Sequence, residues 1–141
     1  MKSFLTEQQV RILKLRAKGM KQSEIAELLG TSRANVSILE RRAREKIERA
    51  KNTLLIWEQI NSKVSVEVHA GEDVFDVPER LFSKADELGV KVPYSTAEVV
   101  AFLVEHAPVE ERLVKRDFVL FLDKKGRLRI GDCLPGEGEV D

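Results

Sequence analysis

Residues 25–32 read IAELLGTS and join two segments whose apolar residues repeat with helical spacing. Ala26 is small enough to let a second helix approach closely, and Gly30 tolerates the left-handed backbone that turns the chain steeply. Ser32 follows as a candidate N-cap of the next helix, with Asn35 at its third position. The stretch therefore predicts two short helices that cross at a steep angle, as in a helix-turn-helix.

One more helix is expected immediately before this pair. Three helical segments therefore fit within residues 6–50, and this additional helix is the first of them. Thr6 and Gln9 have the spacing of a capping box, and Gly19 marks the end of this first helix. The second helix is expected from about Lys21 to Leu29. A lysine at its start cannot accept the amide hydrogen bonds of a helix N-terminus, so we expect water or an anion to satisfy them.

The helix after the turn carries two distinct faces. Val36, Leu39, Ala43 and Ile47 form a narrow stripe at 3-4-4 spacing that should pack on the two preceding helices. The outward face near the helix N-terminus consists of Arg33, Ala34, Ser37, Ile38 and Arg41. In a DNA-binding helix-turn-helix this face enters the major groove, so helix 33–47 is the predicted recognition helix and these five residues the predicted base contacts.

A second set of polar residues is placed to touch phosphates, which fix the register without reading the sequence. The predicted phosphate contacts are Lys21, Gln22, Ser32, Arg42 and Arg44. Two alternatives remain open. Ile38 fits equally a stray apolar surface residue or a contact with the second domain. The arginines at 41, 42 and 44 also fit a solvated face paired with glutamates at helical spacing.

The charge is strongly divided along a chain whose net charge is zero. Residues 1–51 carry 13 basic and 6 acidic side chains, and residues 52–141 carry 11 basic and 18 acidic ones. A basic first part joined to an acidic second part indicates that the first part binds a polyanion, such as double-stranded DNA. The alternative is that the two parts simply attract each other.

The third helix is expected to continue well beyond residue 51. Its apolar stripe extends through Ala50, and residues 54–57 are apolar nearly all round, so another element should bury them. Leu54, Leu55 and Trp57 are therefore predicted to form a contact with the second domain or with a second copy of the chain. A homodimer is attractive because regulators commonly read two half-sites with two copies of the motif.

The second half predicts a small sheet with helices on it, and hence an α+β protein with the element order β-α-β-α-β-β. Strands are expected at about 64–68, 90–92, 113–122 and 128–130, helices at 78–88 and from Ser95 onward, and a hairpin turn at 123–126. The expected domains are a helix-turn-helix at 1–52, a helical connector at 53–61, a dimerisation or effector domain at 62–134 and a flexible tail at 135–141.

Signatures of catalysis, metals and cofactors are missing from the sequence. His69, His106 and Cys133 lack the spacing of metal ligands, and neither GxGxxG nor GxxxxGK[ST] occurs. No enzyme activity, metal or cofactor is therefore predicted. No apolar run approaches the ~20 residues of a membrane span, so a cytoplasmic protein is expected. A helix start at Ser95 and Thr96 suggests an oxyanion or another small-molecule effector.

Four short matches carry a resemblance to known families. Residues 5–10 (LTEQQV), 25–26, 32–37 (SRANVS) and 42–43 resemble region four of bacterial sigma factors and LuxR-type helix-turn-helix domains. The whole chain more closely resembles the Tfx family of archaeal transcriptional regulators. That resemblance implies sequence-specific binding of duplex DNA. The alternative function is a protein-interaction module that contacts the transcription machinery without reading DNA. Lys21 departs from the pattern, because related sequences place a capping Ser or Thr there.

Overall fold

A computed structural model describes residues 1–138 and separates into two compact units, Met1–Leu54 and Leu55–Asp141. The helix α3 (Arg33–Ile60) is continuous across the boundary between them. The flexible tail predicted at 135–141 includes residues 139–141, which lie outside the described part of the chain. Within residues 1–138, none of the helices has the length and hydropathy required to cross a membrane.

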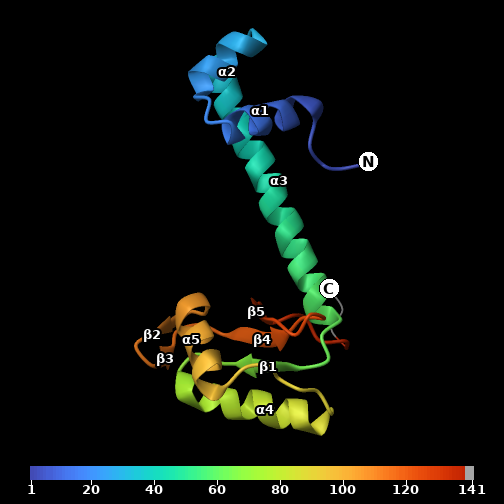
Figure 1. Cartoon of the computed structure of the whole chain (residues 1–141), viewed down its shortest axis with the longest axis vertical. Helices are drawn as coiled ribbons and strands as arrows, with labels where there is room; N and C mark the ends of the chain where they lie inside the picture. Colours follow the sequence, from blue (N-terminus) through green and yellow to red (C-terminus); the bar gives the residue numbers. More distant parts are fainter. Residues whose placement is uncertain (139–141) are drawn as a thin grey trace. The chain divides into compact units, whose positions relative to one another are not determined.

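The first unit contains α1 (Glu7–Ala17), α2 (Gln22–Leu29) and the N-terminal part of α3 (Figure 1). The predicted capping box is confirmed, because the Gln9 N–H donates to Thr6 Oγ1 at 3.1 Å and the Thr6 N–H to Gln9 Oε1 at 3.0 Å. Helix α2 ends at Gly30 in the left-handed region, with φ 66° and ψ 38°. Ser32 Oγ accepts the Asn35 N–H at 3.1 Å at the start of α3. Gly30 and Ser32 thus set the two ends of the turn between α2 and α3.

A small apolar core holds these three helices together. Ile12 of α1, Ile25 and Ala26 of α2, and Val36 of α3 are buried. Leu15, Met20, Leu29 and Leu39 pack around them. Full burial of a branched aliphatic side chain contributes about 1.5–3 kcal/mol, so Ile12, Ile25 and Val36 supply much of the stability of this unit.

The second unit is built on a three-stranded antiparallel sheet in the order β1-β4-β5. Its strands are β1 (Ser65–Val68), β4 (Phe118–Leu122) and β5 (Leu128–Gly131). The 3-10 helix η1 (Val74–Asp76) leads into α4 (Val77–Glu87), and α5 (Thr96–His106) follows. A separate short hairpin pairs β2 (Val109–Glu110) with β3 (Leu113–Val114). Figure 1 shows α4 running alongside β1.

The central strand β4 is buried on both faces. Phe118, Leu120 and Leu122 belong to the core that α4 and α5 complete. Val119 and Phe121 point to the opposite face because side chains alternate along a strand, and they too are buried. On that face Gln59 of α3 reaches β5 and donates from Nε2 to the Asp132 carbonyl oxygen at 2.9 Å. The last turns of α3 therefore belong to this unit's packing.

The predicted α+β class is confirmed, but the predicted strand at 90–92 is wrong. The Val90 N–H donates to the Ala85 carbonyl at 2.9 Å, which ties residue 90 to the end of α4 and not to a strand. Pro93 has no N–H to offer a neighbouring strand. Val90 and Val92 pack on the core from a loop, which explains why their apolar pattern imitated a strand.

The predicted strand at 113–122 is divided into β3 and β4. The Val114 N–H donates to the Glu72 carbonyl at 2.9 Å, and the Lys115 N–H donates to the Pro108 carbonyl at 2.8 Å. These bonds tie β3 to its own hairpin and to the loop before η1, whereas β4 pairs with β1 and β5. The observed order is therefore β-α-α-β-β-β-β, and the sequence analysis missed β2.

Candidate nucleic-acid interface

The predicted base contacts occupy one exposed face at the start of α3. All five side chains, at 33, 34, 37, 38 and 41, are exposed, and Ile38 retains 39% of its accessible surface. At about 100° per residue they fall within a sector of about 140°. From 33 to 41 the helix rises by about 12 Å, close to the ~12 Å width of the major groove. The face has the dimensions of a groove-reading surface.

The opposite face of α3 is fixed by the core. Val36 and Ala43 are fully buried, and Leu39 and Ile47 are partly buried, as the 3-4-4 stripe predicted. Lys46 adds a polar tie on this side, because its Nζ donates to Gln9 Oε1 of α1 at 2.8 Å. The rotation of α3 about its own axis is therefore determined by packing within the unit.

Four of the five predicted phosphate contacts are exposed, and Gln22 is half-buried. Lys21, Ser32 and Arg42 lie at the N-termini of α2 and α3 or on the flank of α3. Lys21 makes no side-chain cap to α2, although its backbone N–H donates to Glu24 Oε1 at 3.3 Å. Ser32 Oγ already serves as the N-cap of α3. Of the three, Lys21 and Arg42 carry a positive charge.

Gln22 and Arg44, the other two, converge on one buried carboxylate. Glu40 Oε1 accepts from Gln22 Nε2 at 3.0 Å, and Glu40 Oε2 accepts from Arg44 Nε at 2.8 Å. Arg16 Nε of α1 lies 2.9 Å from Glu40 Oε1 as an ion pair, although its N–H is not aligned as a hydrogen bond. Only 7% of the Glu40 side chain is exposed. The carboxylate thus links all three helices of the unit.

Glu40 is the structural residue that sequence reasoning underrated. It is one of the glutamates that the helical spacing suggested as surface partners of the arginines, whereas it is buried. Burial opposes ionisation, but hydrogen bonds from Gln22 and Arg44, with the charges of Arg16 and Arg44, outweigh it and lower the pKa of Glu40. A signal was available, since position 40 follows Val36 by four residues on the buried stripe.

The two arginines among the predicted base contacts, Arg33 and Arg41, are less constrained than Arg44. Arg41 Nε lies 3.9 Å from Glu45 Oε1, and both side chains are more than 60% exposed. An exposed pair at this distance contributes little. Arg33 has no carboxylate within 4.0 Å among residues 1–138. Both guanidinium groups can therefore reorient toward a ligand at small cost.

The apolar segment predicted to lie in a contact is largely uncovered within each unit. Leu54 and Trp57 are 62% and 61% exposed, while Leu55 is half-buried. Phe4, 82% exposed, and Leu54 line one cavity of about 670 Å³ with Lys46, Arg49, Ala50 and Thr53. Leu54 and Trp57 are therefore exposed apolar side chains on α3, whereas Leu55 is partly covered.

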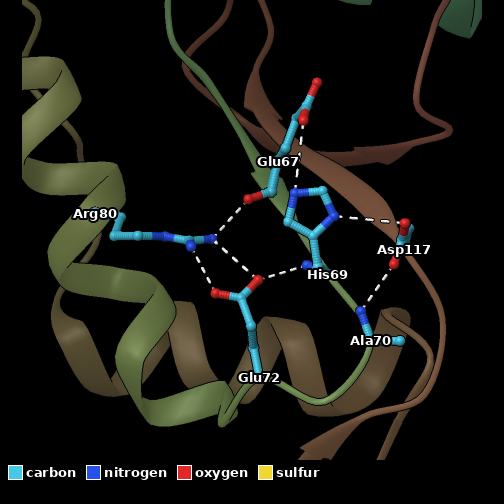
Figure 2. Close-up of polar contacts among 6 residues, drawn as sticks. All are labelled: Glu67, His69, Ala70, Glu72, Arg80 and Asp117. Atoms are coloured by element: carbon cyan, nitrogen blue, oxygen red, sulfur yellow. Dashed lines mark hydrogen bonds and ion pairs between the residues drawn. The ribbon is translucent and has the colours of Figure 1, made fainter.

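His69 belongs to an exposed cluster of charged side chains in the second unit (Figure 2). His69 Nδ1 lies 3.4 Å from Asp117 Oδ2 and its Nε2 3.6 Å from Glu67 Oε2. The Arg80 guanidinium pairs with Glu72 at 2.5 Å and donates to the Glu67 carbonyl at 2.6 Å. Within residues 1–138, no group of three or more His, Cys, Asp or Glu side chains is arranged to hold a metal ion. The cluster joins β1, α4 and the segment before β4.

Cys133 is exposed, and its surroundings disfavour the thiolate. Burial of the sulfur raises the pKa of Cys133, and the negative charges of Glu67, Asp117 and Asp132 raise it further. Nucleophilic and redox cysteines need the opposite, a positive environment that lowers the pKa. The geometry gives this thiol no catalytic activation.

The first unit is basic, joins α2 to α3 through a left-handed glycine, and presents an exposed face about as long as the major groove is wide. These features define the class of helix-turn-helix DNA-binding proteins. The comparisons with known proteins agree. Residues 5–47 match sigma-70 region 4, and residues 50–130 match the family described as DNA-binding protein TFX, C-terminal. The chain belongs to the Tfx family of DNA-binding transcriptional regulators.

Individual relatives extend this result over nearly the whole chain. DNA-binding protein Tfx from Methanothermobacter thermautotrophicus is 33% identical over 129 residues, covering 90% of this chain and 94% of its own. A relative from Thermococcus kodakarensis is 78% identical, covering 95% and 89%. Another, from Methanocaldococcus jannaschii, is 46% identical, covering 92% and 96%. Both are named provisionally as transcriptional regulatory proteins.

Proposed function

We propose that this regulator reads a specific duplex sequence with helix 33–47 in the major groove. The observation that carries the proposal is the division of α3 into a buried stripe and an opposite exposed face about 12 Å long. Arg33 and Arg41 have the donors for guanine O6 and N7, and Ala34 and Ile38 supply apolar contacts for a thymine methyl. Ser37 contributes a hydroxyl that hydrogen-bonds either kind of base pair.

The proposed phosphate contacts divide into two roles. Lys21, Ser32 and Arg42 are exposed and contact the phosphates of the DNA backbone directly. Gln22 and Arg44 are held by Glu40, so their remaining N–H groups are presented to the phosphates in a fixed position. Each neutralised phosphate contributes about 0.9 to the slope of log affinity against log salt. Lys21, Arg42 and Arg44 together correspond to a slope of about −3 per recognition unit.

The experiment selects duplexes from a random library with the purified protein and measures their affinity by fluorescence anisotropy. Arg33→Ala and Arg41→Ala each lower affinity for the selected duplex by about 5- to 150-fold, because a bidentate base contact contributes about 1–3 kcal/mol. Arg49→Ala, an exposed arginine further along α3, is the matched control and changes affinity by less than about threefold. A library that yields no preferred duplex would instead support a module that contacts the transcription machinery.

The exposed segment of α3 supports a homodimer as the working state. Leu54 and Trp57 lie three residues apart on one helix, and both keep most of their surface uncovered. A second copy would bury them and place two recognition helices on one duplex. We propose Leu54, Leu55 and Trp57 as this contact and the unit that follows α3 as the dimerisation or effector domain.

The oligomeric proposal is tested by sedimentation equilibrium. Leu54→Glu and Trp57→Glu convert a dimer to a monomer, because a charge cannot be buried in an apolar contact without a partner. Leu28→Glu replaces an equally exposed leucine on α2, 63% exposed, and leaves the mass unchanged. A monomeric wild-type protein at concentrations well above those used for DNA binding would refute the contact.

An oxyanion at the start of α5 receives little support from its geometry. The Ser95 N–H already donates to Glu98 Oε1 at 3.0 Å, and Ser95 Oγ accepts the Glu98 N–H at 3.2 Å. The hydrogen bonds from Ser95 lower the pKa of Glu98, so its carboxylate places a negative charge at this terminus. An effector, if the regulator has one, needs a different site.

A further inference from the structure

The second unit contains a cavity of about 580 Å³ where three segments meet. Residues 61–64 lead from α3 into β1, residues 89–91 follow α4, and residues 122–126 form the β4–β5 turn. Ser62 Oγ donates to the Leu122 carbonyl at 2.6 Å, and the Leu122 N–H donates to the Val64 carbonyl at 3.1 Å. These two bonds hold the first and third of these segments together.

One lysine from each segment lines this cavity, and we call it the lysine pocket. Its lysines are Lys63, Lys91 and Lys124, all exposed. Among residues 1–138, none of the three ammonium groups has a carboxylate within 4.0 Å. They stand out because residues 52–141 carry 18 acidic against 11 basic side chains. Like charges gathered in a concave site focus a positive potential there.

The single acidic residue of the lining is already occupied. Asp123 Oδ1 accepts the backbone N–H groups of Lys125 and Arg127, each at 2.9 Å, and Oδ2 accepts Arg127 Nε at 2.8 Å. Arg129 lies 3.8 Å from the same Oδ2. The Asp123 side chain is 4% exposed, so its charge is directed into the turn and compensated there.

The remaining lining combines the polar side chains of Asn61 and Ser62 with an apolar part that suits an organic ligand. Val64 and Leu122 are buried and Val90 is half-buried, so the three form a floor beneath the lysines. A volume of about 580 Å³ lies within the ~300–1,000 Å³ of ordinary small-molecule sites. It is many times the ~30 Å³ that one water takes in the liquid, so a bare tetrahedral oxyanion would leave most of it unfilled.

We infer that the lysine pocket binds a small phosphorylated organic molecule, whose phosphate lies among Lys63, Lys91 and Lys124. Lysine ammonium groups are common phosphate ligands, and the apolar floor accepts the organic part. The role of that molecule as an effector rests on the proposed function, whereas its binding does not. Asn61 and Ser62 of the lining also cap the last turn of α3. Asn61 Nδ2 donates to the Trp57 carbonyl at 2.8 Å, and the Ser62 N–H donates to the Gln59 carbonyl at 3.2 Å.

The test is calorimetric titration of the full chain, free of DNA, with ribose 5-phosphate, adenosine 5′-monophosphate, orthophosphate, ribose and adenosine. At least one of the two organic phosphates binds at one site per chain with a Kd of about 1 mM or below. Its unphosphorylated counterpart and orthophosphate bind at least tenfold more weakly. The triple variant Lys63→Gln, Lys91→Gln, Lys124→Gln loses at least tenfold in affinity. A charge-matched control, Lys51→Gln, Lys84→Gln, Lys115→Gln, changes it by less than about twofold.

Three results would overturn the inference. The first is that neither organic phosphate binds at concentrations up to about 5 mM. The second is that the triple variant binds the organic phosphate as tightly as the wild-type chain does. The third is that orthophosphate binds as tightly as the organic phosphate. Anisotropy with the selected duplex is measured in parallel. A triple variant that loses DNA affinity but no ligand affinity assigns the lysines to the nucleic-acid backbone and also overturns the inference. Because ligand binding is measured without DNA, failure of the pocket and failure of the base-reading face are separate results.

Discussion

Replacing Glu40 with glutamine should destabilise the helix-turn-helix unit by about 2 kcal/mol at neutral pH. The carboxylate accepts from Gln22 and Arg44 and pairs with Arg16, so glutamine removes the charge and turns an amide toward two guanidinium groups. A hydrogen bond to a charged group contributes about 1.5–3 kcal/mol, and breaking a fully buried pair costs about 3–5 kcal/mol.

The loss of stability lies in the lower part of these ranges, because water can hydrate the two arginines once the carboxylate is gone. Arg44 and Arg16 are 59% and 36% exposed, so neither is left as an unpaired buried charge. Glutamine also keeps one oxygen that can accept from Gln22. Glu45→Gln is the matched control: it lies on the same helix, 63% exposed and 3.9 Å from Arg41, and costs less than about 0.5 kcal/mol.

Guanidinium unfolding followed by far-UV circular dichroism measures both variants. A loss of about 2 kcal/mol moves the midpoint down by roughly 0.5 M. The pKa of Glu40 is lowered, so its contribution is present above the ordinary value of 4.5 and lost as the pH falls through the folded-state pKa. The gap between wild type and Glu40→Gln therefore closes in acid. A midpoint equal to that of Glu45→Gln, or a gap that persists in acid, would refute the assignment of Glu40.

Three further substitutions test other elements by thermal or denaturant unfolding. Gly30→Val costs about 1–2 kcal/mol, because φ is 66° there, and Gly30→Asn costs less; equal costs would contradict this reasoning. Gly131→Ala costs about 1 kcal/mol, since its Cβ would lie 2.2 Å from Gln59 Oε1, and adding Gln59→Ala should recover part of the loss. Asp123→Asn costs about 1–2 kcal/mol at pH 7. The pKa of Asp123 is lowered because the hydrogen bonds in the turn outweigh its burial. The difference in stability between wild type and Asp123→Asn therefore disappears as the pH falls below 3.8.

The first unit was readable from sequence because its limits are set by local chemistry. A capping box at Thr6, a left-handed glycine at position 30 and an N-cap at Ser32 each act within four residues. The buried stripe of α3 follows from helical period alone. Glu40 was underrated because its burial depends on Arg16 and Gln22, which come from two other helices.

The second unit was harder because long-range pairing decides its strands. Residues 90–92 have the alternation of a strand, but their backbone is engaged by the end of α4. Residues 113–114 and 118–122 are apolar, but the charged residues 115–117 separate them. This charged segment between β3 and β4 leaves the sheet, and Asp117 Oδ1 accepts the Ala70 N–H at 2.8 Å. No local signal specifies either partner. The hairpin turn at 123–126 was predicted correctly, since Asp123 and Gly126 form it through neighbouring residues.

The uncapped start of α2 has a consequence for engineering this protein. Lys21 stands where Ser, Thr or Asp would stabilise the helix by about 1 kcal/mol, and its charge opposes the positive end of the helix dipole. Because we place Lys21 at a phosphate, Lys21→Asp should raise the melting temperature and weaken duplex binding together. Selection for heat resistance alone would therefore drive this position away from DNA binding, a stability–activity trade-off located in one side chain.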